Sequence, residues 1–218
     1  MNLRLRISQI RKSHNGDRVL DDCSFFFEQG GVYVLTGPNG SGKSTLLRIC
    51  ALLERPDSGE IAYFLGQERL EDNIFLRRRV TLVLPQVGIF NTSVFNNISY
   101  GLRVRGAGRS EIEQKTAEML AFSGLTQKRG QNAPSLSSGE KQRMGIARGL
   151  VIEPEMLFLD EPTASIDETN TRLIEEMILE KKKQGITMII TTHDRAQAER
   201  LADKLLMIRD KKLVSVPA

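Results

Sequence analysis

The stretch Gly37-Pro38-Asn39-Gly40-Ser41-Gly42-Lys43-Ser44-Thr45 decides the fold of this 218-residue chain. It fits the pattern G-x-x-x-x-G-K-[ST], the P-loop, whose glycines let successive backbone N–H groups point at phosphate oxygens. Lys43 supplies a charge for the outer phosphates, and the Ser44 hydroxyl is suited to ligate Mg²⁺. An apolar strand is predicted before it (Val32–Leu35), and after it a helix (Thr45–Leu53) whose positive N-terminal end faces the phosphates. The motif and its context predict nucleotide binding.

The composition excludes several classes of protein. With 40% hydrophobic residues and a net charge of +4, the chain can bury a full core and does not require a nucleic-acid partner. No apolar run approaches the roughly 20 residues that span a bilayer, and the N-terminus lacks a signal-peptide core. Cys23 and Cys50 lie in apolar stretches without metal-like spacing, which predicts two buried, reduced thiols.

Strand and helix patterns divide the chain into two kinds of structure. Four further strands are predicted at Leu3–Ile7, Cys23–Phe27, Ile61–Leu65 and Val80–Leu84. From about 93 to 150 the pattern becomes helical, and Ser110–Glu113 is interpreted as a capping box that opens a helix. After Met156, strands alternate with helices. The prediction is an α/β P-loop NTPase core (1–88 and 152–218) with an N-terminal antiparallel β subdomain and an inserted α-helical subdomain (about 89–151).

An acidic pair follows a second buried strand. The apolar run Met156–Leu159 is typical of a central parallel strand, and ligands bind beyond the carboxyl ends of such strands. Asp160 is therefore placed to hold Mg²⁺, and Glu161 to act as general base on a water aligned with the γ-phosphate. An ordinary surface Asp-Glu pair is the alternative. A weaker anion signal lies at Ser137–Glu140, a capping box that opens a helix running from about Glu140 to Leu150.

Taken together, these motifs resemble the ATPase subunit of an ABC transporter. The order is P-loop, Gln86 region, the signature Leu136–Glu140, the strand ending in Asp160-Glu161, Ala164–Asp167 and His193, and it covers nearly the whole chain. The resemblance implies ATP and Mg²⁺ as ligands, held between two copies packed head to tail. It implies that Ser137 and Gly139 contact the γ-phosphate bound to the partner's P-loop, and that Asp167 joins the two sites. It also implies that His193 contacts the γ-phosphate and orients the attacking water.

Several positions depart from the family pattern. The resemblance places His14 where an aromatic ring stacks on adenine, with Val19 beside the base, although 12–16 also fits a solvated turn. The usual Mg²⁺-sensing glutamine slot falls on Pro85, so either a local shift brings Gln86 into place or the contact is altered. Ser138 stands where glycine is usual, which would cost about 1 kcal/mol if the position needs a positive φ. Glu140 replaces the common glutamine, and its capping box should turn it away from phosphate.

The resemblance also implies partners. A homodimer would dock on integral membrane permease subunits near the insertion, at the cytoplasmic face of the inner or plasma membrane, with a periplasmic solute-binding protein as a further partner and no nucleic acid. The apolar loop Ile89–Phe95 fits such an interface, or else Phe90 and Phe95 anchor the helical lobe. The segments 51–59, 95–102 and 192–198 resemble importers of oxyanions such as tungstate or molybdate. The chain ends soon after its last helix, so no appended regulatory domain is expected.

Three other classes of protein share part of this pattern. ABC-type ATPases that maintain chromosomes or repair DNA carry a long coiled coil between the P-loop and the acidic strand, and this chain lacks sustained heptads there. ABC proteins of the ribosome carry two cassettes in one chain. A plain P-loop kinase would not explain Leu136–Glu140 or Asp167. The alternative function retained is a non-transport ABC ATPase that acts on DNA or the ribosome.

Overall fold

The computed structural model describes residues 3–216, which divide into two compact units. The first unit holds the described residues up to Leu82, then Glu155–Glu161, and then the chain from Lys181 onward. The second unit holds Val83–Pro154 and Pro162–Glu180. This division differs from the boundaries predicted from the sequence, because 83–88 and 162–180 group with the helical unit. The predicted limits of the insertion stay a prediction.

An antiparallel sheet forms the N-terminal part of the first unit. Its order is β2-β1-β4-β5, formed by β1 (Leu3–His14), β2 (Asp17–Phe27), β4 (Ser58–Leu65) and β5 (Glu68–Leu70). Leu3, Leu5 and Ile7 alternate into the core and are at most 1% exposed, as the alternating sequence pattern predicts. Asn15 and Gly16 both take a positive φ, which suits the tight hairpin between β1 and β2. The predicted antiparallel subdomain is confirmed.

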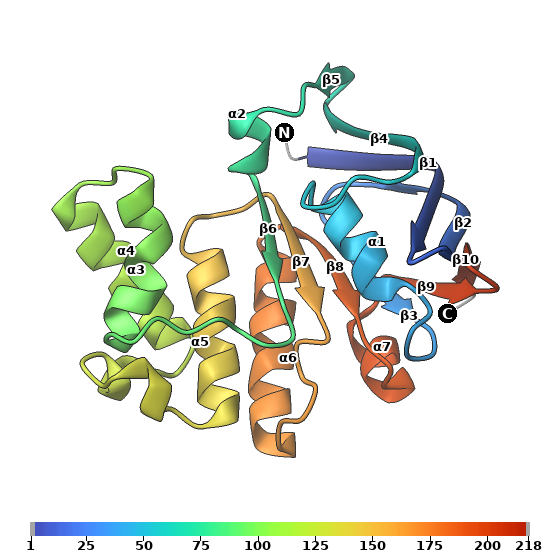
Figure 1. The fold of residues 1–218 in the computed structure, drawn as a ribbon. Helices are drawn as coiled ribbons and strands as arrows, with labels where there is room; N and C mark the ends of the chain where they lie inside the picture. Colours follow the sequence, from blue (N-terminus) through green and yellow to red (C-terminus); the bar gives the residue numbers. More distant parts are fainter. Residues whose placement is uncertain (1–2, 217–218) are drawn as a thin grey trace. The chain divides into compact units, whose positions relative to one another are not determined.

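A second, largely parallel sheet carries the strands that precede the motifs. Its order is β10-β9-β3-β8-β7-β6, formed by β3 (Val32–Thr36), β6 (Val80–Val83), β7 (Met156–Asp160), β8 (Thr187–Thr191), β9 (Lys204–Arg209) and β10 (Lys212–Val216). Strands β3, β8 and β7 run parallel and are buried along their whole length. Parallel strands end at one edge of a sheet, and Figure 1 shows β7 and β8 pointing the same way. Asp160 and Thr191 therefore lie side by side.

Three helices belong to the first unit. They are α1 (Lys43–Cys50), α2 (Ile74–Arg77) and α7 (Arg195–Leu201). Helix α1 follows the P-loop and packs on β7 and β8. It begins two residues earlier and ends three residues earlier than the predicted helix Thr45–Leu53, because Gly42 takes the N-cap position and Leu52 turns to a positive φ.

The second unit is helical. It contains α3 (Val94–Val104), α4 (Arg109–Phe122), α5 (Ser138–Leu150) and most of α6 (Glu168–Lys183), with short 3₁₀ turns at Thr126–Lys128 and Ala133–Ser135. Helices α3, α4 and α5 pack on one another around a shared apolar cluster that includes Val94, Ile98, Leu120 and Met144. This unit carries the signature residues at the start of α5.

One predicted helix start is wrong. The Ser110–Glu113 pattern predicts an N-cap at Ser110, yet α4 begins at Arg109 with Gly108 as its N-cap and no side-chain capping bond. Gly108 adopts the extended conformation of an N-cap, so Ser110 already lies inside the helix and cannot cap it. Glu113 instead pairs with Arg129 at 2.6 Å.

The described residues bear on two further predictions. Cys23 and Cys50 are buried free thiols, as the sequence predicts, and burial raises the pKa of each. Across residues 3–216, no helix combines the length and apolar character that a membrane crossing needs.

Candidate nucleotide site

The P-loop bends tightly between β3 and α1. Gly37, Gly40 and Gly42 all have a positive φ, between 78° and 143°. At Gly42 a β-carbon would lie 2.9 Å from side-chain carbons of Val19 and Leu20. At Gly37 it would lie 2.9 Å from Ser41 Oγ and 3.0 Å from a backbone oxygen. Glycine at 37 and 42 is therefore required by space as well as by φ.

Lys43, the first residue of α1, holds the loop in shape. Its Nζ donates to the carbonyl oxygens of Gly37 (2.9 Å) and Pro38 (3.2 Å), and only 6% of its side chain is exposed. The same Nζ lies 3.7 Å from Glu161 Oε1. The charge of Lys43 is thus directed into the P-loop, while Pro38 and Asn39 stay exposed on its outer rim.

A buried oxygen cluster lies at the carboxyl ends of β7 and β8. Asp160 Oδ1 accepts hydrogen bonds from Ser44 Oγ (3.0 Å) and Thr191 Oγ1 (2.7 Å), and Asp160 is only 2% exposed. Hard cations such as Mg²⁺ prefer oxygen ligands of this kind. Within residues 3–216, no group of three or more His, Cys, Asp or Glu side chains is arranged to hold a metal. Mg²⁺ is commonly held by one or two protein oxygens together with phosphates and water, which fits the Ser44–Asp160 pair.

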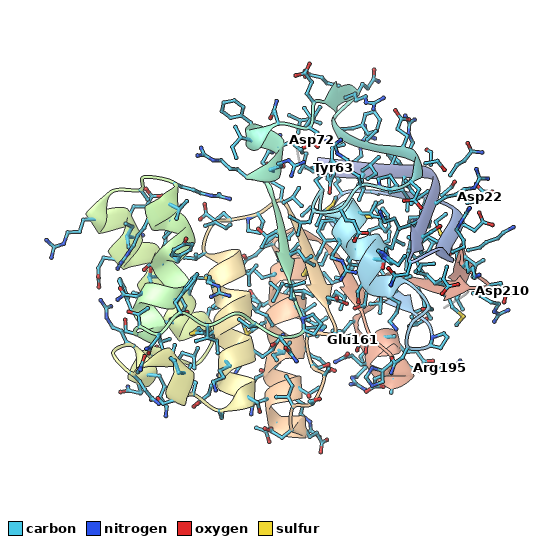
Figure 2. The ribbon with its side chains drawn as sticks, in the orientation of Figure 1. Asp22, Tyr63, Asp72, Glu161, Arg195 and Asp210 are labelled. Carbon is cyan, nitrogen blue, oxygen red and sulfur yellow. The ribbon has the colours of Figure 1, made fainter. Side chains whose placement is uncertain are left out.

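Glu161 and His193 face each other next to this cluster. His193 Nδ1 lies 2.9 Å from Glu161 Oε2, and the Glu161 backbone N–H donates to Thr191 Oγ1 at 2.9 Å. The Glu161 carboxylate therefore lies between Lys43 and His193, 16% exposed, whereas 61% of the His193 side chain is open to solvent. Figure 2 shows Glu161 just beyond the end of β7. A carboxylate so placed is suited to take a proton from a water molecule.

The residues expected to flank a nucleotide base lie at the P-loop. His14 Nε2 is 3.4 Å from Thr45 Oγ1 and 3.6 Å from Glu54 Oε1. Val19 packs against Gly42. Sequence reasoning missed Glu54, which also pairs with Lys12 and Arg48, because its position after α1 carries no motif.

Two features of the loop fit a phosphate ligand. Ser41 Oγ is one of four side-chain N or O atoms in the described part of the chain that are buried without a hydrogen-bond partner. The N-cap of α1 is Gly42, so no side chain caps the first N–H groups of that helix. Uncapped N–H groups at a helix start and an unpartnered hydroxyl are the donors that a phosphate accepts.

In the second unit, the signature residues form a complete capping box. Ser137 Oγ accepts from the Glu140 N–H (3.3 Å), and Glu140 Oε2 accepts from the Ser137 N–H (2.9 Å). That second bond holds the pKa of Glu140 below its ordinary value, and Lys128 at 3.6 Å adds to the effect. The structure confirms the predicted capping box, in which the Glu140 side chain turns back to the N-cap backbone. Ser138 lies within α5 and is not among the residues with positive φ, so the expected backbone cost does not arise.

The other two predicted site residues in this unit have different surroundings. Asp167 accepts from the backbone N–H and side-chain Nδ2 of Asn170, both at 2.8 Å, and these bonds lower its pKa. Gln86 is exposed in the segment after β6, and its neighbour Val87 packs against Gly145 of α5, where a β-carbon would lie 2.4 Å from Val87 Cγ2. The role of Gln86 toward Mg²⁺ stays a prediction.

The structure therefore gathers the predicted residues into two groups. The P-loop, Asp160, Glu161, His193, His14 and Val19 belong to the first unit, and Gln86, Ser137, Gly139 and Asp167 to the second. Within the first group, direct contacts join the loop, the acidic pair and the histidine.

Comparisons with known proteins agree with this geometry. The family model "ABC transporter" matches residues 20–164. The chain is 37% identical, over 97% of both chains, to "Tungstate uptake system ATP-binding protein TupC" of Peptoclostridium acidaminophilum. It is 38% identical to a "Probable anion import ATP-binding protein" of Haloferax volcanii, over 87% of this chain and 72% of that protein. It is also 33% identical to "Phosphate import ATP-binding protein PstB 2" of Natronomonas pharaonis, over 96% and 78%.

A solved structure has the same fold. It is cbiO1 from Clostridium perfringens, part of the ABC transporter complex cbiONQ, with a TM-score of 0.86 and 27% identity. The match covers 98% of this chain and 88% of that one. The residues matched by the family model, 20–164, include the P-loop, the acidic strand end and the signature helix. The chain therefore belongs to the ABC transporter family, as an ATP-binding ATPase subunit.

Proposed function

We propose that this ATPase subunit powers the uptake of an oxyanion of the tungstate or molybdate type. The relatives support this cargo class, since their names state tungstate uptake, anion import and phosphate import. All three are named as ATP-binding proteins of uptake or import systems, so the alternative of a DNA or ribosome ATPase finds no support among them. The proposal that the chain hydrolyses ATP at this site rests on one observation. The Glu161 carboxylate lies between Lys43 and His193, next to Asp160.

In this proposal, hydrolysis uses groups already in place. When bound, Mg²⁺-ATP supplies the γ-phosphoryl group that is transferred to water. Ser44 and Asp160, which are hydrogen-bonded to each other, would hold the cation, and the P-loop amides with Lys43 would hold the phosphates. Glu161 accepts the proton that the attacking water loses, so that the oxygen can bond to phosphorus. His193 contacts the carboxylate through Nδ1 at 2.9 Å, and in this proposal it also orients the attacking water.

The proposed assembly needs a second copy. Ser137 and Gly139 of one copy would complete the P-loop site of the other, with Asp167 between the two sites. Its support is the family resemblance, together with the exposure of Ser137 at the capped start of α5. The dimer would work as a peripheral complex on the cytoplasmic face of the membrane, joined to permease subunits and served by a periplasmic solute-binding protein.

The surface of the second unit supports a permease contact. Leu84, Phe90, Tyr100 and Val104 are 43–66% exposed, and the rings of Phe90 and Tyr100 lie 4.6 Å apart. Exposed aromatic and aliphatic groups of this kind are typical of protein interfaces. Of the two aromatics in the predicted interface loop, Phe90 fits the interface, while Phe95 packs partly buried against the helical core.

Purification from membranes tests this proposal. The chain should copurify with a multi-spanning protein, and Phe90→Ser should weaken that association, whereas Val214→Ser, on the other unit, should not. In vesicles that contain the permease and binding protein, tungstate or molybdate should stimulate ATP hydrolysis and sulfate should not. Recovery of ribosomes or DNA in place of a membrane protein would overturn the transport function.

A further inference from the structure

Asn170, in the first turn of α6, contacts the two segments proposed to face the partner copy. Its backbone N–H and its side-chain Nδ2 each donate to a different oxygen of the Asp167 carboxylate. A capping aspartate needs only the backbone bond to begin a helix. The side-chain bond is additional, and it fixes the plane of the carboxylate at the position proposed to join the two sites.

The remaining polar atom of Asn170 points to α5. Its Oδ1 accepts from Arg143 Nε at 3.2 Å, and the Arg143 guanidinium also donates to the carbonyl of Ser123. Arg143 is 8% exposed, so its buried guanidinium N–H groups need these acceptors in place of water. In Figure 1, α5 and α6 lie side by side in the second unit.

The contact with the signature is steric. A β-carbon at Gly139 would lie 2.2 Å from Asn170 Cγ and 2.5 Å from Oδ1. The space next to Gly139 is therefore filled by the Asn170 amide. Glycine is required at 139 by this packing, independently of any phosphate that its N–H would bind.

We infer that Asn170 is a positioning residue that locks the Asp167 loop to the start of α5. Through Asn170, the signature residues Ser137 and Gly139 and the loop residue Asp167 move as one body. A site shared between two copies needs both segments to arrive together, and a loose loop would lose entropy each time the copies join. The use of this lock at a shared site rests on the proposed function, whereas the lock itself lies within one chain.

Hydrogen exchange on the chain without nucleotide tests the lock directly. Asn170→Leu keeps the bulk next to Gly139 and removes both side-chain bonds. Amides of 164–170 and of 138–143 should then exchange roughly tenfold faster together. Glu168→Gln is the control, because it removes only the Glu168–Arg172 pair of exposed side chains in the same turn, and it should change neither segment.

A second variant separates the two side-chain hydrogen bonds of Asn170, one with Asp167 and one with Arg143. Asn170→Asp keeps an acceptor for Arg143 but places a carboxylate next to Asp167, so only the Asp167 loop should loosen. Faster exchange in that loop alone with Asn170→Leu, and unchanged exchange at the start of α5, would overturn the inference. This readout needs no dimer, so it stands even if the two-copy site fails.

The dependence of ATPase activity on protein concentration tests whether the Asn170 contacts assist assembly of the two copies. The protein concentration that gives half-maximal ATPase activity should rise about tenfold in Asn170→Leu, while ATP affinity of the single chain stays unchanged. Asn170→Asp should give a smaller rise. Activity strictly proportional to concentration in the parent protein would contradict the two-copy site and leave the exchange result intact. A parent-like concentration dependence in Asn170→Leu would overturn the role of the lock in assembly.

Discussion

At the scale of single residues, Glu161 combines an unusual backbone with a central position. Its φ is 47°, in the left-handed region that costs a non-glycine residue about 1 kcal/mol or more. The bond from its N–H to Thr191 Oγ1 and the contacts of its carboxylate with Lys43 and His193 hold it there. Non-glycine residues with such backbones cluster at functional sites, which agrees with the proposed general base.

Replacing the Glu161 carboxylate should separate binding from hydrolysis. Glu161→Gln keeps the size of the side chain and removes the base, so the single-turnover rate should fall by about 10²–10⁴. ATP affinity should not fall, because the P-loop backbone and Lys43, which would hold the phosphates, are unchanged and Lys43 loses only its 3.7 Å contact with the carboxylate. The matched control is Glu176→Gln, an exposed glutamate of α6, which should hydrolyse ATP normally. Parent-rate hydrolysis by Glu161→Gln would exclude Glu161 as the base.

Substitutions at two P-loop glycines distinguish the cost of a positive φ from the cost of a steric clash. Gly40→Ala meets nothing within 4 Å and adds only the strain of a positive φ, which should cost about 1 kcal/mol. Gly42→Ala adds contacts of 2.9 Å with Val19 and Leu20, so it should lower the free energy of unfolding by about 2–4 kcal/mol. Urea unfolding monitored by circular dichroism measures both. Equal losses would show that the packing of Val19 on the loop contributes nothing.

At the scale of elements, α5 shows what a capping pattern does and does not establish. Ser137–Glu140 forms the reciprocal capping box that its sequence predicts, whereas the similar Ser110–Glu113 pattern caps nothing. Both fit the same short rule. The difference is that Ser137 is preceded by a 3₁₀ turn and Leu136 in extended conformation, which breaks the helix there, while α4 begins before Ser110.

The capping box of α5 should make the free energy of unfolding depend on pH. The Ser137 N–H lowers the pKa of Glu140 below its ordinary 4.5, so the carboxylate stabilises the folded chain above that pH. This contribution is lost as pH falls through the lowered value. Glu140→Gln should therefore be less stable than the parent near neutral pH, by a few tenths of a kcal/mol because the site is partly solvated. Urea unfolding from pH 7 to 3 should show this gap closing below about pH 4.5, and a gap that widens in acid would contradict it.

At the scale of the whole molecule, each unit holds part of the predicted machinery. The first unit binds, by proposal, the phosphates and the cation, and the second carries the signature and Asp167. Neither group of residues forms a complete catalytic site in the family pattern. Two copies that exchange these groups would, by this proposal, complete both sites, and ATP hydrolysis would then depend on protein concentration.

A bulky charged side chain at Ser137 should prevent two copies from sharing their sites. Ser137→Arg places a long side chain at the exposed start of α5, so ATP should still bind while ATP-dependent dimers are lost. ATPase activity of the parent should rise more than linearly with protein concentration, and the variant should remain at a low, linear rate. Sedimentation with Mg²⁺-ATP measures the dimer, with Ser215→Arg on the exposed side of β10 as the control. A normal dimer formed by Ser137→Arg would contradict the shared site.

The sequence by itself determined the features that depend on neighbouring residues. The P-loop, the buried strand ending in Asp160-Glu161, the α5 capping box and the two buried thiols could all be predicted, because each follows from residue types at fixed local spacing. The family resemblance added roles for His193, Asp167 and His14 that local physics alone did not assign.

Only the tertiary structure decided which distant residues meet. Val19 packing on Gly42, the Glu54 contact with His14, and Asn170 joining Asp167 to Gly139 and Arg143 leave no local signal. Each depends on the register of strands or the packing of helices far apart along the chain. The physical reason is that backbone spacing fixes neighbours within an element, whereas contacts between elements are set by how their buried faces fit together.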